Sequence, residues 1–403
     1  MRRRSVQITL LVLGIVAALF IAIPPLVDER ENKLLKKPPY TASERALKLH
    51  KELTIADLHA DSLLWGRDLL ERSTYGHVDI PRLADGNVAL QVFSLPTKSP
   101  HALNIESNED KNDDIFWLAI ADRWPPATWN SLTERALYQA RRLHQFARGS
   151  RGGFVVIESS ADLSSYLERR RLNGKLAAGL LSIEGAHALD GKLGNLEVLY
   201  RAGYRMMSPS HFFDNDIGGS AAGVHKTGLT EKGREWVRQM EARRMIVDLA
   251  HASAKTIEDV LAIANRPLVV SHTGVKGTCN NNRNLSDDQI RAVAARGGLI
   301  GIGYWDTASC GSDARAIVKA MRYVSARVGV EHVALGSDFD GAITAPFDTT
   351  GVVEITDAML EAGYSGQEIR MIMGENAVRF WRRICRRNRG VRRPMNGPFT
   401  ACP

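Results

Sequence analysis

Two histidines in the second half of the chain follow short apolar runs that are spaced like successive strands. His251 comes two residues after Ile246–Leu249, and His272 comes two residues after Pro267–Val270. Between them, Ser253 to Asn265 has its apolar residues at helical spacing. The two strands of such a strand–helix–strand unit run parallel, so both imidazoles emerge at the same end. We therefore expect His251 and His272 to share a site, and paired imidazoles favour a metal.

Other ionisable side chains follow apolar runs in the same way. His59 and Asp61 follow the first run, and an H-x-D motif in extended chain points both side chains to one face. Glu184, His211 and Asp338 follow three further runs. A single buried histidine or acid is more often a hydrogen-bonded core residue than a ligand. Ionisable residues at the ends of six strands on one rim are better explained by a site.

Five of these residues form a suitable ligand set for two divalent ions: His59, Asp61, Glu184, His251 and His272. Two ions need about three protein ligands each, and one carboxylate can bridge them. Nitrogen and oxygen donors without thiolate suit zinc best, although manganese, cobalt or iron fit the same ligands. Apart from His211, which is treated below, no role is assigned to the other histidines, of which His187 lies only three residues past Glu184.

Strands and helices that can position these residues alternate along the chain. Capping boxes at Ser131, Ser286 and Ser365 predict three helix starts. A long and mostly helical insertion, Pro96 to Leu176, follows the second strand and includes an extra strand at Phe154–Ile157. Eight β/α units over about 300 residues are typical of a (β/α)8 TIM-type barrel with its chemistry at the C-terminal rim. The eight predicted strands are Thr54–Leu58, Val88–Leu95, Ala178–Ile183, Arg205–Ser208, Ile246–Leu249, Leu268–Val270, Leu299–Gly303 and Val333–Gly336.

The N-terminal segment is apolar enough to cross a membrane. Ile8–Val27 carries no charge, and as a helix it would span about 30 Å. We favour an uncleaved signal anchor, because Pro24-Pro25 stands where a small-residue cleavage site is expected. A cleaved signal peptide and a twin-arginine signal are the alternatives. Basic residues on both sides nearly balance, so the charge count leaves the topology open.

Four parts are predicted: an anchor or signal at 1–27, a charged linker at 28–42, the barrel at 43–388 and a basic tail at 389–403. Eight arginines between 379 and 393, together with Arg2–Arg4, carry more positive charge than the net charge of +8 for the whole chain. These ends can lie on anionic lipid head groups or stay solvated. There is no interleaving of aromatic and basic residues and no nucleic-acid motif, so no nucleic-acid partner is expected.

The four cysteines form no C-x-x-C motif, which argues against a cysteine zinc site. In an exported protein they can pair as Cys279–Cys310 and Cys385–Cys402, and the sequence leaves this pairing open.

The order of these motifs resembles the membrane dipeptidase, or renal dipeptidase, family of metallopeptidases with amidohydrolase-type barrels. The likeness runs from about Ala56 to about Arg383. It implies two Zn²⁺ per chain and substrate contacts from His211, Arg283 and Asp338, and it suggests a homodimer. His59 and Asp61 would bind one ion and His251 and His272 the other, with Glu184 bridging. The motifs are His59-Ala60-Asp61, Ile183-Glu184-Gly185, Ser210-His211-Phe212-Phe213, Val247-Asp248-Leu249-Ala250-His251-Ala252-Ser253, Val270-Ser271-His272-Thr273, Asn282-Arg283-Asn284 and Gly336-Ser337-Asp338-Phe339-Asp340-Gly341.

The chemistry of these side chains agrees with hydrolysis of dipeptides. A metal-bridging hydroxide would attack the peptide carbonyl, and His211 would stabilise the oxyanion. Asp338 would carry the proton from the water to the leaving amine. Arg283 would anchor the substrate carboxylate one residue beyond the scissile bond, which limits the substrate to dipeptides. The alternative for Arg283 is a loop arginine that caps the next helix.

Two other functions fit the same residues. One is another dinuclear amidohydrolase-type hydrolase, acting on a cyclic amide, lactone, phosphoester or N-acyl amino acid, and the other is a non-catalytic zinc-binding barrel. The H-x-D motif and Glu184, in place of H-x-H and a bridging lysine, favour the dipeptidase. We expect a membrane-anchored enzyme of a bacterial inner membrane, with its barrel on the periplasmic or extracellular side.

Overall fold

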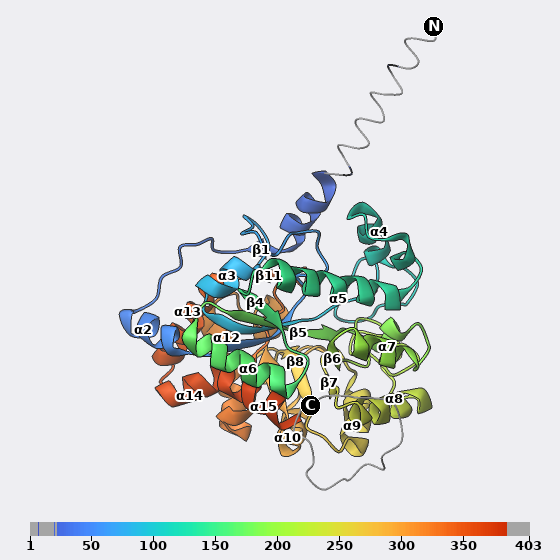
Figure 1. Cartoon of the computed structure of the whole chain (residues 1–403). Helices are drawn as coiled ribbons and strands as arrows, with labels where there is room; N and C mark the ends of the chain where they lie inside the picture. Colours follow the sequence, from blue (N-terminus) through green and yellow to red (C-terminus); the bar gives the residue numbers. More distant parts are fainter. Residues whose placement is uncertain (1–6, 8–19, 21, 385–403) are drawn as a thin grey trace, which may run out of the picture.

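The computed structural model describes Gln7, Phe20 and residues 22–384 (Figure 1). Within these residues a parallel sheet has the strand order β7-β6-β5-β3-β2-β10-β9-β8. A further strand, β4, lies outside this order and pairs with β5. The two ends of this order meet, because Asp248 bridges Val269 and the Leu249 amide donates to the Val269 carbonyl at 2.8 Å. The sheet therefore closes into the predicted eight-stranded α/β barrel. Its strands are β2 Ile55–Ala60, β3 Val88–Phe93, β5 Ala177–Ile183, β6 Tyr204–Met207, β7 Ile246–Val247, β8 Val269–Thr273, β9 Leu299–Ile302 and β10 Val333–Leu335.

Each predicted strand is present, and the main differences lie at the strand ends. β7 stops two residues early, because the Asp248 side chain accepts the Ala250 amide at 3.0 Å and turns the chain. β8 runs on to Thr273, so His272 lies inside a strand rather than after it. Every residue of β2, β3 and β5 is buried, as expected for parallel strands covered on both faces.

Helices surround the barrel and begin where the sequence supplies caps (Figure 1). Ser286 and Ser365 form the full predicted capping boxes, and Ser131 accepts the Glu134 amide. The insertion between β3 and β5 is mainly helical and contains the extra strand, as predicted. Its elements are α4 Asp114–Ala121, α5 Leu132–Gly149, β4 Phe154–Val156 and α6 Ser160–Leu172. The other helices are α2 Glu44–Glu52, α3 Ile80–Asp85, α7 Asn195–Arg201, α8 Glu231–Ala242, α9 Ala254–Ile263, α10 Asp287–Ala295, α11 Asp306–Ser309, α12 Ala314–Val328, α13 Val353–Glu361, α14 Gly366–Arg370 and α15 Asn376–Ile384.

Part of the predicted linker is packed against the barrel. Residues 22–31 are helical, and Asp28 is buried where it accepts from Arg67 Nε at 2.7 Å. The next residues form β1, Lys33–Leu34, which pairs with β11, Thr344–Ala345, after β10. Residues 28–34 were predicted to be a linker because they are charged, and this prediction is corrected. The Asp28 carboxylate is in a buried ion pair, and the backbone of Lys33–Leu34 is paired with another strand.

Most of the predicted anchor, Ile8–Val27, and the whole basic tail, 389–403, fall outside the described residues. The pairing Cys385–Cys402 falls there as well. Among the residues that the structure describes, no helix has the length and apolar character needed to cross a membrane.

Candidate metal and substrate site

The predicted site residues come together at the C-terminal rim of the barrel. His59 lies in β2 and His272 in β8, while the others follow β2, β5, β6, β7, β8 and β10 directly or in the loops beyond them. All of them except Asp338, which is half-buried, are largely buried. The residues at this rim are His59, Asp61, Glu184, His211, His251, His272, Arg283 and Asp338.

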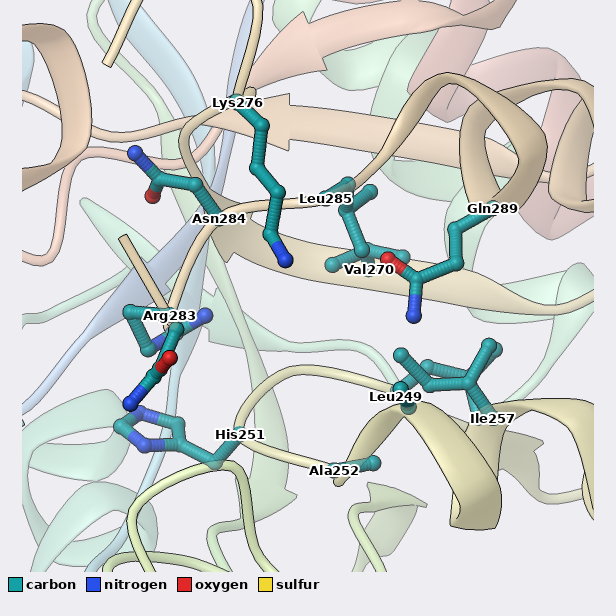
Figure 2. A pocket seen from close by; sticks show the side chains of 12 residues that line it. Leu249, His251, Ala252, Ile257, Val270, Lys276, Arg283, Asn284, Leu285 and Gln289 are labelled. Carbon is teal, nitrogen blue, oxygen red and sulfur yellow. The ribbon is translucent and has the colours of Figure 1, made fainter. Parts of the chain in front are cut away.

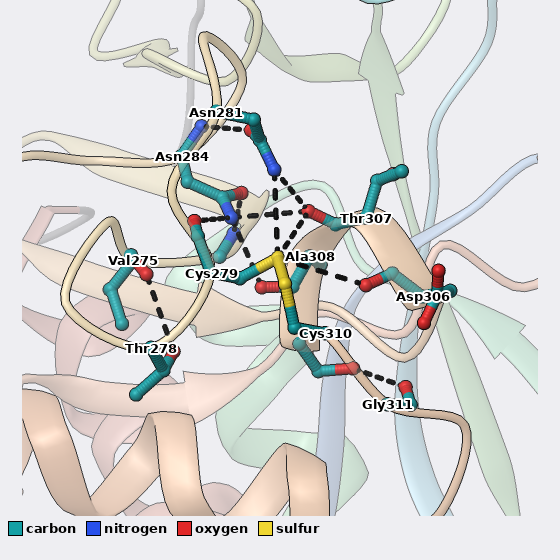
Figure 3. Close-up of a disulfide and its surroundings, with 12 residues drawn as sticks. Val275, Thr278, Cys279, Asn281, Asn284, Asp306, Thr307, Ala308, Cys310 and Gly311 are labelled. Atoms are coloured by element: carbon teal, nitrogen blue, oxygen red, sulfur yellow. Dashed lines mark hydrogen bonds between the residues drawn. A yellow bond between two sulfur atoms is a disulfide. The ribbon is translucent and has the colours of Figure 1, made fainter.

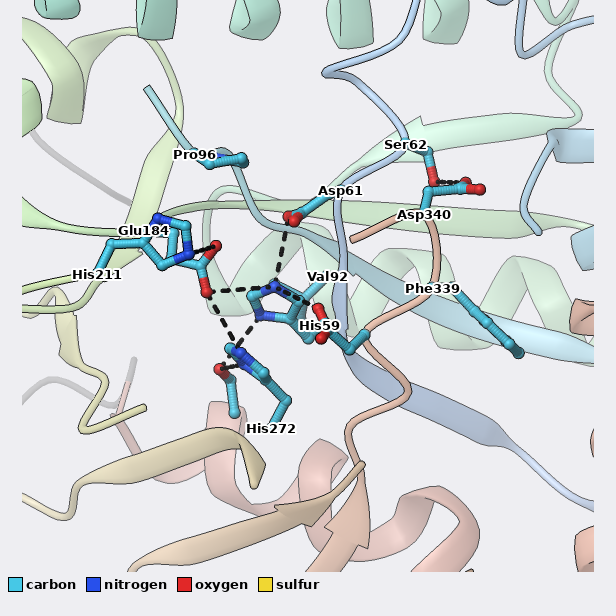
Figure 4. Close-up of polar contacts among 12 residues, drawn as sticks. His59, Asp61, Ser62, Val92, Pro96, Glu184, His211, His272, Phe339 and Asp340 are labelled. Atoms are coloured by element: carbon cyan, nitrogen blue, oxygen red, sulfur yellow. Dashed lines mark hydrogen bonds and ion pairs between the residues drawn. The ribbon is translucent and has the colours of Figure 1, made fainter. Parts of the chain in front are cut away.

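Glu184 lies between His211 on one side and the rings of His59 and His272 on the other (Figure 4). Its Oε1 atom is 3.1 Å from Nε2 of His251, 3.3 Å from Nε2 of His272 and 3.7 Å from Nε2 of His59. Its Oε2 atom is 3.1 Å from Nε2 of His211. One carboxylate therefore contacts histidines from four different strands.

Three overlapping groups at this rim have the composition and spacing to hold a metal ion. They are His59, Glu184 and His272; Glu184, His211 and His251; and His59, Asp61 and Asp338. In each, one potential ligand atom per residue lies within 4.8 Å of the others. His59 and Glu184 each belong to two groups, so neighbouring ions would share ligands.

Several of these buried atoms lack a hydrogen bond. His59 Nε2, Asp61 Oδ1 and Glu184 Oε1 are buried and make none. Buried polar atoms are nearly always hydrogen-bonded, and leaving them unpaired is costly. A divalent cation would satisfy such converging nitrogen and oxygen atoms, so the residues present fit a metal centre.

Burial and neighbouring charges set the protonation of the site. Burial raises the pKa of Glu184. Burial alone would lower the pKa of His59, but the Glu184 and Asp61 carboxylates outweigh it and raise that pKa to about 10. Burial lowers the pKa of His251 and His272 well below the ordinary value, which keeps both imidazoles in the neutral, metal-binding form.

Asp338 has the properties of a group that exchanges a proton near neutral pH. Burial raises its pKa to about 7, and nearby His59 and Arg283 oppose this rise. Its Oδ1 atom lies 3.6 Å from His59 Nε2, so it faces the metal-binding groups. The Asp338 backbone has φ of 62°, in the left-handed region where non-glycine residues are strained. His251 shares this conformation, also with φ of 62°.

Arg283 reaches the rim from the loop that follows β8. Its Nη2 atom donates to the His272 carbonyl at 2.8 Å, and its guanidinium lies 5.7 Å from the Trp305 ring centre. Figure 2 shows Arg283 beside His251 at the edge of a cavity of about 40 Å³. Arg283 is thus held next to the metal-binding groups rather than at a helix N-terminus.

A disulfide joins the Arg283 loop to the segment after β9 (Figure 3). It links Cys279 to Cys310, which confirms one of the two pairings considered from the sequence. Asn284 Nδ2 donates across the same junction to the Thr307 and Ala308 carbonyls, at 3.1 and 3.2 Å. The loop is therefore fixed on both sides of Arg283.

Sequence reasoning missed one aromatic residue of the site, Trp305, and set aside one histidine, His187. Trp305 follows β9 and lies 5.8 Å, between ring centres, from His272, and no motif marks it. His187 is buried against Phe213 with ring centres 4.8 Å apart, and it belongs to none of the three metal-binding groups. Burial lowers the pKa of His187 to about 3.

Comparison with known proteins shows which family the sequence matches. The sequence model of the family described as membrane dipeptidase, peptidase family M19, matches residues 43–393. Dipeptidase tcpJ of Claviceps purpurea (strain 20.1) is 29% identical over 321 residues, which are 77% of this chain and 69% of the relative. An uncharacterized protein in the pqqA 5' region of Klebsiella pneumoniae is 32% identical over 259 residues, 60% of this chain and 93% of the relative.

Two solved structures share the fold. A metallo peptidase from Rhodobacter sphaeroides, liganded with a phosphinate mimic of the dipeptide L-Ala-D-Ala, superposes with a TM-score of 0.67. It is 24% identical, and the match covers 82% of this chain and 99% of that one. The probable dipeptidase PvdM from Pseudomonas aeruginosa gives a TM-score of 0.70 at 18% identity, covering 85% and 98% of the two chains. At these identities the likeness establishes the fold alone.

Proposed function

Because the chain belongs to the membrane dipeptidase family of metallopeptidases, peptidase family M19, we propose that it is a zinc-dependent dipeptidase whose centre is built around Glu184. The observation that carries this proposal is the convergence of His59, His251 and His272 on that carboxylate, with Asp61 Oδ1 3.3 Å from Nε2 of His59. The unpaired buried atoms His59 Nε2, Asp61 Oδ1 and Glu184 Oε1 support a bound cation.

The proposed centre holds two Zn²⁺ ions. His59 and Asp61 would hold one ion, His251 and His272 would hold the other, and the Glu184 carboxylate would be shared between them. Their Nε2 and carboxylate oxygen atoms already face one another, with His59 Nε2 3.3 Å from Asp61 Oδ1. Such a pair of ions supplies a nucleophilic water at neutral pH, because the cations lower its pKa.

The chain's own side chains then handle the proton and the substrate charges. Asp338 accepts the proton of the attacking water and returns it to the leaving amine nitrogen, a task for which a pKa of about 7 is well matched. His211, whose Nε2 atom lies 3.1 Å from Glu184 Oε2, is proposed to face the carbonyl group of the scissile peptide bond. There it stabilises the negative charge that develops on the carbonyl oxygen.

Arg283 sets the length of the substrate in this proposal. Its planar guanidinium, held between the His272 carbonyl and Trp305, pairs with the C-terminal carboxylate of a dipeptide. A longer peptide has an amide at this point and leaves the buried guanidinium without its partner. The related Rhodobacter enzyme holds a mimic of L-Ala-D-Ala, so we propose that D-residues are accepted at the second position.

N-acyl amino acids are the second candidate substrates, because they carry the same carboxylate one residue beyond an amide bond. The test is hydrolysis by the purified full chain, with and without chelator, of L-Ala-L-Ala, L-Ala-D-Ala, N-acetyl-Ala, L-Ala-L-Ala amide and a tripeptide. Rapid, chelator-sensitive cleavage of the two free dipeptides alone is expected. Cleavage of the amide or the tripeptide at a similar rate would contradict the proposal.

We also propose that the chain is exported and held at a membrane by residues 8–27. The uncharged sequence of this segment and the Cys279–Cys310 disulfide support the proposal, because disulfides persist in oxidising compartments. Fractionation of expressing cells tests it: the protein is expected in the membrane fraction and accessible to protease only from the outer side.

A further inference from the structure

We propose that the hydroxyl of Ser271 is a shared positioning group that orients one histidine of each proposed metal position, and that Asp248 sets its direction. The inference rests on the metal pair proposed above and goes beyond it to the residues behind the ligands. Ser271 is fully buried and Asp248 is 2% exposed. Both are therefore positioning residues, and the Ser271 hydroxyl is the group that contacts the imidazoles.

The Ser271 hydroxyl uses its full hydrogen-bonding capacity in this position. It donates to Asp248 Oδ2 at 2.5 Å. Its oxygen faces Nδ1 of His272 at 2.9 Å and Nδ1 of His59 at 3.3 Å. A hydroxyl has one hydrogen and two acceptor lone pairs. Because the hydrogen goes to Asp248, both rings must donate their Nδ1 hydrogens to Ser271.

This arrangement fixes which ring nitrogen is free to bind a metal. A neutral imidazole with its proton on Nδ1 keeps a lone pair on Nε2. The Nε2 atoms of both rings point to Glu184 Oε1, at 3.3 Å from His272 and 3.7 Å from His59. One serine therefore selects the metal-binding tautomer of a ligand on each side of the bridging carboxylate.

Asp248 is itself held in one orientation. Its Oδ1 atom accepts the amides of Ser271 at 2.9 Å and Ala250 at 3.0 Å, which leaves Oδ2 for the serine hydroxyl. In Asp248→Asn the side-chain oxygen of the new asparagine must accept the hydrogen bonds from these two backbone N–H groups. The new NH₂ group then faces Ser271 Oγ, and the hydroxyl hydrogen has to turn toward an imidazole. His272 would be driven to carry its proton on Nε2.

The barrel contains a second aspartate–serine pair that serves as a matched control. Ser337 is equally buried and bonds to buried Asp57 through both its amide and its hydroxyl. Its hydroxyl otherwise contacts the His59 carbonyl at 2.9 Å and the Phe339 amide at 3.1 Å, and no imidazole ring. Ser337→Ala and Asp57→Asn thus remove comparable buried hydrogen bonds without touching a ring nitrogen.

The first experiment measures zinc affinity by chelator competition in the full chain. Ser271→Ala is expected to weaken the binding of both ions by about 10- to 100-fold, the usual effect of losing a group that orients a ligand. Ser337→Ala is expected to change zinc affinity by less than about threefold. Equal losses in the two variants, or a loss confined to one ion, would overturn the shared role of Ser271.

The second experiment reads the tautomer of His272 from the ¹⁵N shifts of its ring in the metal-free protein. The wild type and Asp57→Asn are expected to carry the proton on Nδ1, and Asp248→Asn on Nε2. An unchanged tautomer in Asp248→Asn would overturn the role of Asp248. This measurement needs no activity, so it stays decisive even if no dipeptide is cleaved, an outcome that would contradict the proposed function instead.

Discussion

Glu184 Oε1 lies 3.1 Å from Nε2 of His251, although the two residues follow different strands of the barrel. The same oxygen faces His272 and His59, so the carboxylate is the contact that the three predicted histidine ligands share. The backbone at Glu184 is held by the segment after the neighbouring strand, since the Glu184 amide donates to the Leu95 carbonyl at 3.0 Å. Ligand convergence therefore follows from the parallel pairing of neighbouring strands.

Replacing Asp338 should separate proton transfer from metal binding. Asp338→Asn keeps the volume of the side chain but cannot take up a proton at neutral pH. We expect both zinc ions to remain and kcat to fall by about 100- to 10,000-fold. Metal analysis and steady-state kinetics check this, and full activity in the variant would remove Asp338 from the mechanism.

Replacing Arg283 should act on substrate binding. Arg283→Ala removes the charge-assisted partner of the substrate carboxylate, and we expect kcat/KM for dipeptides to fall on the order of 100-fold, mainly through KM. A C-terminally amidated dipeptide should be equally poor for both proteins. A similar KM for free dipeptides in variant and wild type would show that Arg283 is not the anchor.

The disulfide should support the same anchor. Cys279 and Cys310 are 31 residues apart, and opening this loop in a Cys279→Ser/Cys310→Ser variant should cost about 3–4 kcal/mol of unfolding free energy. Because Arg283 lies in that loop, KM should rise while kcat changes little. Wild type treated with reductant should reproduce both effects, and an unchanged KM would mean that Asn284 and its contacts suffice.

His50 should make the fold sensitive to acid. It is buried with its ring nitrogens 2.9 Å from Thr356 Oγ1 and 3.1 Å from the Gly86 carbonyl, and burial lowers its pKa from 6.5 to about 4. The folded protein keeps the ring neutral, whereas the unfolded chain protonates it below pH 6.5. This stabilisation is complete above pH 6.5 and is lost as the pH falls toward 4.

Denaturant unfolding at about pH 7.5 and pH 5 measures the effect. From pH 7.5 to pH 5, the free energy of unfolding should fall on the order of 2 kcal/mol more for the wild type than for His50→Gln. His101→Gln, at a histidine whose side chain is 72% exposed, should behave like the wild type. Equal pH dependence in wild type and His50→Gln would contradict this account.

Local patterns in the sequence were sufficient to predict the barrel and the residues at its rim. Apolar runs give the strands, and parallel strands bring their last residues to one end, so His251 and His272 could be placed together without knowing the fold. The Cys279–Cys310 pairing was considered from the sequence but stayed open, because it depends on the loops after β8 and β9 lying side by side in the fold.

Contacts between distant segments had no such local signal. Asp57 lies in β2 and Asp248 directly follows β7, and nothing in the sequence marks their partners: Ser337 follows β10, 280 residues from Asp57, and Ser271 lies in β8, 23 residues from Asp248. Asp28 belongs to a charged stretch that composition marks as a linker. Its burial depends on Arg67, which pairs with Asp28 at 2.7 Å and with Asp340 at 2.8 Å.

The central claim is a two-metal centre held by Glu184, and zinc content per chain tests it most directly. The wild type should bind two Zn²⁺ ions per chain and lose dipeptide hydrolysis in step with their removal. Glu184→Gln should keep the fold but lose high-affinity zinc and at least about 1000-fold in kcat/KM. Glu197→Gln on α7, at a side chain that is 41% exposed, should match the wild type. Two tightly bound ions in Glu184→Gln, or hydrolysis by fully metal-free wild type, would contradict the account.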